Sequence, residues 1–150
     1  MAKRRPARRG TPSHPGPGFQ PEDLLTFIEL RPFTRRWQQL KLTDADLQAL
    51  QILIMTRPHV GTVIEGTGGL RKMRFARLHG DTGKSGGLRV CYAYFEPVAT
   101  IVLAIVYQKG EQDDLTAADK AALRSAVARV ERSLMSRPYR STPRPGADDR

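Results

Sequence analysis

Two segments of the chain each begin with a glycine pair and continue into alternating cationic and apolar residues. Residues 68–75 are Gly-Gly-Leu-Arg-Lys-Met-Arg-Phe, and residues 86–91 are Gly-Gly-Leu-Arg-Val-Cys. Successive side chains of a strand point to opposite faces, so Lys72 and Arg74 share one face, opposite the apolar residues around them. If the second segment pairs with the first, Arg89 can join that face. We therefore predict a cationic surface on one face of a sheet.

A cationic surface can bind RNA passively, and it can also cleave RNA without a metal ion. In that reaction the ribose 2′-hydroxyl attacks the adjacent phosphorus. The step needs a base for the hydroxyl, positive charge on the phosphorane oxygens and an acid for the leaving 5′-oxygen. Arginine suits the second role because it stays charged and donates paired hydrogen bonds. A lysine crowded by other cations suits proton transfer, because like charges lower a lysine pKa. The residue pattern alone leaves catalysis and passive binding equally open.

Composition indicates a single basic domain. The 150 residues carry a net charge of +10, which favours nucleic acid or another polyanion as partner. Cys91 is the only cysteine, so no disulfide can form within the chain, and we expect a small buried side chain in a reducing compartment. No apolar run of signal-peptide type follows the basic N-terminus, and the longest apolar stretch, 101–107, is too short to span a bilayer. These features predict a soluble, cytoplasmic protein with no membrane partner.

The sequence predicts neither a metal site nor a cofactor. His14, His59 and His79 are isolated from one another and from any cysteine pair, which argues against zinc. Asp113 and Asp114 could bind a divalent ion, but their place just before a helix favours a solvated acidic pair.

The remaining patterns predict the elements that position the cationic strands. The apolar run 101–106 favours a central strand that is covered on both faces. Thr43 and Thr116 are candidate N-caps, each followed three residues later by an aspartate. The expected elements are strands at 24–30, 70–77, 87–96 and 99–108, a helix pair at 33–41 and 43–56, a loop at 57–69, and a last helix at 116–134.

This order, β-α-α-β-β-β-α, predicts an α+β fold. Its small, mostly antiparallel four-stranded sheet is flanked by two N-terminal helices and a C-terminal helix. The domain is expected at 23–136. The basic segment 1–22 and the proline-rich segment 137–150 have little to bury and are predicted to be disordered tails.

Three motifs, taken together, resemble the RelE/HigB group of toxins from bacterial type II toxin–antitoxin systems, in the RelE/ParE superfamily. They are residues 66–72, residues 86–90, and residues 107–115 followed by the helix at Thr116, and the resemblance covers roughly 24–135. It implies a RelE-like fold and a metal-independent, ribosome-dependent mRNA endonuclease, or mRNA interferase. Such a toxin cuts the codon exposed in the ribosomal A site and so inhibits translation. The implied partners are the ribosome, mRNA and a HigA-like helix-turn-helix antitoxin.

The resemblance also implies roles for individual residues. Expected catalytic residues are Lys72, Arg74, Arg89 and Lys109. Expected RNA contacts are Arg71, Arg77, Lys84, Tyr92 and Glu111.

The chain departs from the family pattern after its last strand. Gly110 and Gln112 stand where an asparagine and a second lysine are expected, and the last helix has no tyrosine. Base stacking is therefore expected of Tyr92, Tyr94 or Tyr107, or of the ribosome.

Three alternatives remain open at the level of sequence. ParE-type toxins share this architecture and inhibit DNA gyrase without cutting RNA, although they have no need of the sheet cations. The second alternative is a non-catalytic RNA-binding module, and the test that separates it from an enzyme is whether Arg89→Ala abolishes activity while leaving RNA or ribosome affinity within a few-fold. A merely solvated cationic face would show no salt-sensitive association with polyanions.

Overall fold

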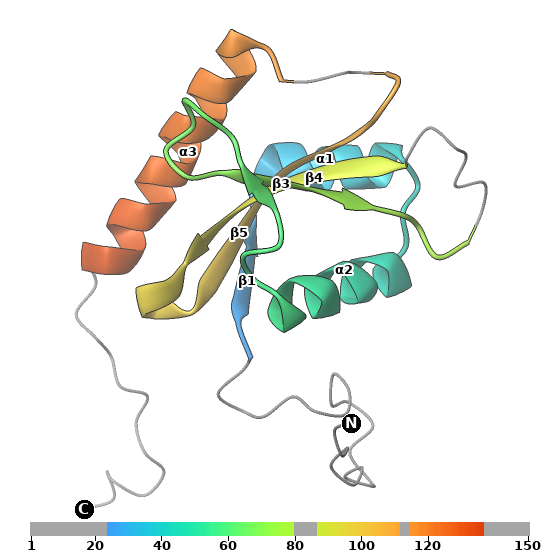
Figure 1. The fold of residues 1–150 in the computed structure, drawn as a ribbon, viewed down its shortest axis with the longest axis horizontal. Coiled ribbons are helices and arrows are strands. Elements are labelled where there is room, and N and C mark those ends of the chain that lie inside the picture. Colours follow the sequence, from blue (N-terminus) through green and yellow to red (C-terminus); the bar gives the residue numbers. More distant parts are fainter. Residues whose placement is uncertain (1–23, 80–86, 112–114, 137–150) are drawn as a thin grey trace, which may run out of the picture.

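A computed structural model describes residues 24–79, 87–111 and 115–136. The predicted tails, Lys84 and the pair Asp113-Asp114 lie outside these residues, so the domain boundaries stay a prediction. In chain order (Figure 1) the elements are β1 (Thr26–Glu29), α1 (Arg31–Gln39), α2 (Asp44–Thr56), β2 (Thr62–Val63), β3 (Arg71–Phe75), β4 (Leu88–Phe95), a 3₁₀ turn (Glu96–Val98), β5 (Thr100–Gln108) and α3 (Ala117–Ser136).

The strands form one sheet in the order β1-β5-β4-β3-β2, in which β1 runs parallel to β5 and the other pairs are antiparallel. This confirms the predicted α+β class and the mostly antiparallel sheet. The strand β5 lies inside the sheet and is buried over most of its length, as its apolar sequence predicts. The prediction of four strands is wrong by one, because β2 pairs with β3 inside the segment expected to be a loop. Two exposed residues carry too little pattern to indicate a strand.

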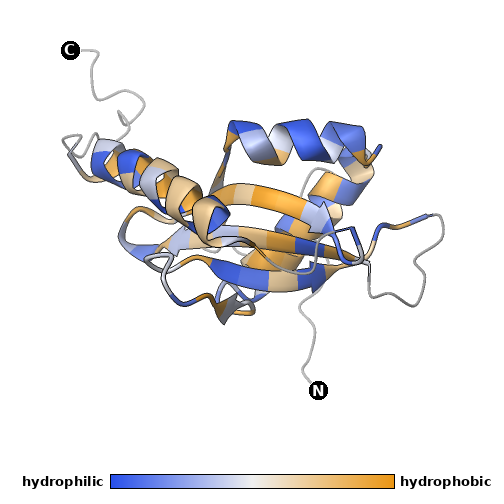
Figure 2. Cartoon of the chain, turned by 90° about the horizontal axis from the view of Figure 1, so that it is seen from above, coloured by the Kyte–Doolittle hydropathy of each residue, from blue (hydrophilic) through white to orange (hydrophobic). Residues whose placement is uncertain are grey.

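Helices cover both faces of the sheet (Figure 1), and each face has its own core. The core under α1 and α2 includes Phe33, Trp37, Leu50, Ile54, Met73, Val90, Tyr92 and Leu103. The core under α3 includes Cys91, Ala93, Val102, Ala104, Tyr107, Leu123 and Val127. Cys91 is fully buried, as expected. Figure 2 shows hydrophobic residues gathered along the inner strands and hydrophilic ones along the helices.

Helix starts follow the predicted caps. The Thr43 side chain and the carboxylate three residues later exchange hydrogen bonds with each other's backbone at the start of α2. Thr116 and Asp119 do the same before α3, at 3.0 and 3.1 Å. The first helix begins two residues earlier than predicted, because Pro32 occupies its first turn, where no backbone N–H is required.

The cap carboxylate Asp46 also links α2 to the segment after β3. Its side chain accepts hydrogen bonds from the Thr43 backbone N–H at 2.9 Å and from the Leu78 backbone N–H at 2.8 Å. Burial by itself would raise the pKa of Asp46. The hydrogen bonds from Leu78 and Thr43 and the charge of Arg77 outweigh burial, so the pKa lies below its ordinary value of 3.8.

Substituting Asp46 by alanine should therefore destabilise the fold in a pH-dependent way. We expect the free energy of unfolding to fall by about 2 kcal/mol at neutral pH, because two backbone N–H groups lose their acceptor. A lowered folded-state pKa stabilises the fold above the unfolded-state pKa of 3.8, and this contribution is lost as the pH falls below it. The free energies of unfolding of wild type and Asp46→Ala, measured with urea, should therefore approach each other at acid pH. The exposed first-turn variant Asp44→Ala is the control, and an equal loss in both variants would contradict the prediction.

Candidate active site

The pairing of β3 with β4 brings three cationic side chains onto one face of the sheet. Arg74 lies directly opposite Arg89, and Lys72 lies opposite Cys91, two residues further along β4. Residues two apart on a strand share a face, so Lys72, Arg74 and Arg89 form a single group. The predicted meeting of these three residues on one surface is confirmed. Their roles in a reaction stay a prediction.

The three cations line an open recess of about 500 Å³, which we call the cationic recess. Its lining consists of Val60, Thr62, Lys72, Met73, Arg74 and Arg89. Among the residues that the structure describes, its lining includes one with a hydroxyl group and none with a carboxylate. Arg74 is exposed, and Lys72 and Arg89 are half-buried. Like charges directly opposite each other on a sheet destabilise it, and a bound anion would relieve that repulsion. The recess is therefore suited to a phosphate group.

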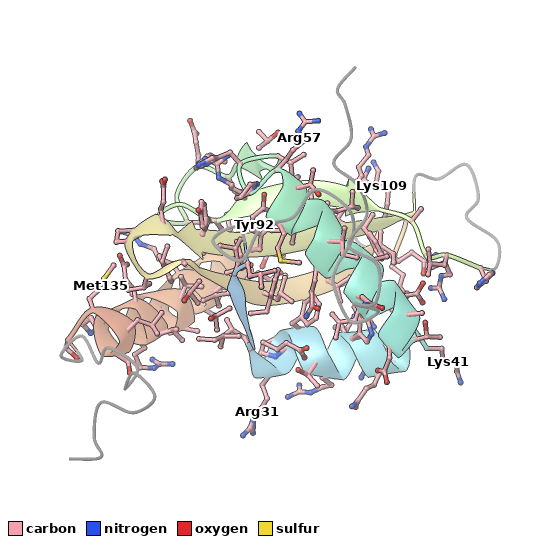
Figure 3. All side chains as sticks on the ribbon, turned by 90° about the horizontal axis from the view of Figure 1, so that it is seen from below. Arg31, Lys41, Arg57, Tyr92, Lys109 and Met135 are labelled. Atoms are coloured by element: carbon pink, nitrogen blue, oxygen red, sulfur yellow. The ribbon has the colours of Figure 1, made fainter. Side chains whose placement is uncertain are left out.

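Lys109 lies beside the cationic recess and does not line it. Its backbone N–H donates to the Gly87 carbonyl at 3.2 Å, two residues before Arg89 on the neighbouring strand. Figure 3 shows Lys109 at the rim of the domain. From this edge its ammonium group is a candidate for contact with a ligand that extends out of the recess.

Tyr92 lies in the core on the opposite face of the sheet (Figure 3). It is fully buried; its hydroxyl donates to the Pro58 carbonyl at 2.9 Å and accepts from the Gly61 N–H at 3.0 Å. Burial raises the pKa of Tyr92, against the opposing effects of the Gly61 hydrogen bond and the Arg71 charge. A ring at this depth cannot stack on a base, so the expected RNA contact at Tyr92 is corrected to an internal role.

Arg71 does not join the cationic face either. Its Nη1 donates to the carbonyls of His59 at 3.1 Å and Gly61 at 2.7 Å. Strand alternation places it with Met73 and Phe75, on the face away from Lys72 and Arg74. Its guanidinium is thus engaged with the backbone of the segment before β2 and is not presented to RNA in the recess.

Two other expected RNA contacts also bind other parts of the protein. Arg77 donates to the Leu40 carbonyl at the end of α1, at 3.1 Å. Glu111 forms an ion pair with Arg36 of α1 at 2.6 Å. Neither residue is among the described residues that line the recess, so their RNA contacts stay a prediction beside these contacts with α1. Lys84 lies outside the described residues.

The two other tyrosines considered for stacking differ in exposure. Tyr107 is buried in the core under α3, which excludes stacking on a base. Tyr94 is half-buried and packs edge-on against His59, with ring centroids 5.2 Å apart. Neither ring lines the cationic recess.

Val60 and Thr62 are recess residues that the sequence did not indicate. Thr62 pairs with Lys72 in the β2–β3 ladder, which turns its side chain to the cationic face. Both residue types favour strands, but two of them in a loop-like segment give no usable signal. Only the pairing with β3 reveals them.

The parts of the chain that the structure describes contain neither a metal-binding cluster nor a membrane-spanning helix. Within 24–79, 87–111 and 115–136, no three His, Cys, Asp or Glu side chains come close enough to hold a metal ion. In the same ranges, no helix has the length and apolar character needed to cross a membrane.

The chain is similar in structure to a solved bacterial toxin. No protein-family model matches the chain. Its structure is similar to that of the Escherichia coli toxin RelE, solved in the free state as a mutant with two arginines replaced by alanine. The two chains are 14% identical, the TM-score is 0.43, and the similarity covers 71% of this chain and 98% of that chain.

Proposed function

We propose that this chain is the toxin of a type II toxin–antitoxin system and acts as a ribosome-dependent mRNA endonuclease. The observation that carries the proposal is the cationic recess, in which Arg74 and Arg89 meet across two strands with Lys72 beside them. The resemblance of the glycine-led motifs and of residues 107–115 to RelE/HigB toxins supports it. A ParE-like gyrase inhibitor would have no need of such a recess.

The charges in the recess are suited to the following reaction. The ribose 2′-oxygen forms a bond to the adjacent phosphorus while the bond from phosphorus to the 5′-oxygen breaks. The products are a 2′,3′-cyclic phosphate and a 5′-hydroxyl. Arg74 and Arg89 can donate to the non-bridging oxygens, where negative charge develops. Lys72 in the recess and Lys109 beside it are the candidates for moving the two protons. This scheme requires no metal ion.

The proposed partners follow from the same surface. The recess is open, so a single strand of mRNA held in the ribosomal A site can enter it. A cognate helix-turn-helix antitoxin of HigA type would have to cover or distort this surface to neutralise the toxin. Its gene should adjoin the gene of this chain.

Induced expression in a bacterial host with mapping of transcript 5′-ends tests the proposal. We expect growth arrest with new ends inside translated codons for the native chain and for Arg35→Ala, an exposed α1 arginine outside the recess. Arg89→Ala should cause neither effect. Growth arrest without new RNA ends would contradict RNA cleavage and favour a gyrase-type target. New ends that persist in Arg89→Ala would contradict the assigned site.

A further inference from the structure

The segment 58–62 forms one side of the cationic recess. Hydrogen bonds to side chains on the opposite face of the sheet hold this segment in place. Val60 and Thr62 line the recess. The backbone groups of Pro58, His59 and Gly61 form hydrogen bonds with the side chains of Tyr92 and Arg71. Four hydrogen bonds join these two side chains to the backbone of residues 58–61, at 2.7 to 3.1 Å. We call this arrangement the backbone clamp.

Close packing adds to the clamp at Gly61. A Cβ atom at this position would lie 2.9 Å from the Arg71 Cβ, 3.0 Å from the Lys72 carbonyl oxygen and 3.1 Å from Tyr92 Cε1. The Lys72 oxygen is a backbone atom and the Arg71 Cβ is bonded directly to the backbone, so neither can move away without a shift of the chain. Glycine is therefore required here for its small size, and the segment lies directly against β3.

The backbone clamp links side chains on the opposite face of the sheet to the shape of the recess. Gly61 is the residue between Val60 and Thr62, so its position sets where both side chains stand relative to Lys72, Arg74 and Arg89. Val60 and Thr62 are the uncharged residues of the recess lining, together with Met73. A phosphate bound by the arginines would bring its ribose and base against such a wall.

We propose that Tyr92 and Arg71 are positioning residues, which fix the wall formed by Val60 and Thr62 so that it orients the ribonucleotide whose phosphate the recess binds. This inference rests on the proposed function and extends it by naming the part of the site that orients the sugar and base. Neither residue touches the substrate. A shift of about 1 Å in such a wall can reduce the rate of a reaction up to about a hundredfold, because attack requires an aligned 2′-hydroxyl.

Kinetics on ribosomes programmed with a short mRNA test the inference. Tyr92→Phe should lower kcat about tenfold or more and leave KM within about twofold, because it changes alignment and leaves the cationic surface intact. Arg71→Lys should retain more activity than Arg71→Met, since an ammonium group can still donate to the His59 and Gly61 carbonyls. Thr62→Val should reproduce the kcat loss of Tyr92→Phe. Val127→Ala, a core change under α3, controls for lost stability.

Hydrogen exchange of the Gly61 amide gives a readout that does not depend on activity. Tyr92→Phe should speed this exchange at least about tenfold relative to Val127→Ala, because the amide loses its acceptor. Unchanged Gly61 exchange would overturn the clamp. A wild-type kcat in Tyr92→Phe, with Arg89→Ala inactive, would overturn the inference and leave the proposed function standing.

If the wild-type protein cuts no RNA, the proposed function fails and the inference, which rests on it, is overturned with it. Faster Gly61 exchange in Tyr92→Phe would in that case establish the clamp as a structural feature only.

Discussion

Replacing Arg89 by alanine should lower the kcat of mRNA cleavage by about a hundredfold to a thousandfold, the usual effect of removing one donor to a developing oxyanion. Arg89 lies opposite Arg74, and both line the recess in which a phosphate would be bound. The alanine variant keeps Arg74 and Lys72, so it should still associate with ribosomes. Single-turnover cleavage of ribosome-bound mRNA measures the effect directly.

Two further variants show whether charge or geometry matters at this position. Arg89→Lys keeps the charge but loses the planar pair of donors, so its rate should lie between wild type and alanine. Arg35→Ala removes an exposed arginine outside the recess and should leave kcat near that of wild type. A rate for Arg89→Ala within about threefold of wild type would remove this residue from the proposed chemistry.

The Arg74→Glu variant should change activity and stability in opposite directions. A glutamate opposite Arg89 replaces a repulsive cross-strand pair by an attractive one, which should raise the free energy of unfolding by roughly 0.5 kcal/mol. The same carboxylate would repel a phosphate and engage Arg89. We therefore expect cleavage to fall at least about a thousandfold, since two donors are lost together.

Urea unfolding and single-turnover cleavage on the same preparation of Arg74→Glu separate the two effects. Arg74→Gln is the matched control, because it removes the cation without adding a negative charge. It should lose less activity than the glutamate variant and gain less stability. A lower free energy of unfolding in Arg74→Glu than in Arg74→Gln would contradict repulsion between Arg74 and Arg89. The inference that the recess is suited to a phosphate depends on that repulsion.

Local sequence patterns were sufficient to predict most of the helices and strands of the fold. Both helix starts at Thr43 and Thr116 depend on a side chain that bonds to backbone three residues away, and such contacts are visible in the sequence. The grouping of Lys72, Arg74 and Arg89 also followed from strand alternation, because it needed only the pairing of β3 with β4. The short strand β2 was missed, since its existence depends on its partner.

The expected RNA contacts at Arg71 and Tyr92 show where a resemblance and a local pattern conflict. Strand alternation places Arg71 on the face of Met73 and Phe75, and Tyr92 on the face of Val90, so the opposite face was already indicated. The family resemblance nevertheless suggested RNA contacts for both.

The observed contacts of two other expected site residues could not have been predicted from the sequence. The ion pair between Glu111 and Arg36 joins residues 75 positions apart. The contact of Arg77 with the Leu40 carbonyl joins residues 37 positions apart. No local pattern links such partners, because only the packing of α1 against the sheet brings them together.

Cleavage of a ribosome-bound mRNA that carries a single 2′-deoxynucleotide at the cut position tests the central claim most directly. The cationic recess is proposed to stabilise attack by the ribose 2′-hydroxyl. The deoxy substrate should therefore remain intact, while the all-ribose mRNA yields a 2′,3′-cyclic phosphate and a 5′-hydroxyl. Cleavage of the deoxy position at a similar rate, or products with a 5′-phosphate, would contradict the proposed reaction.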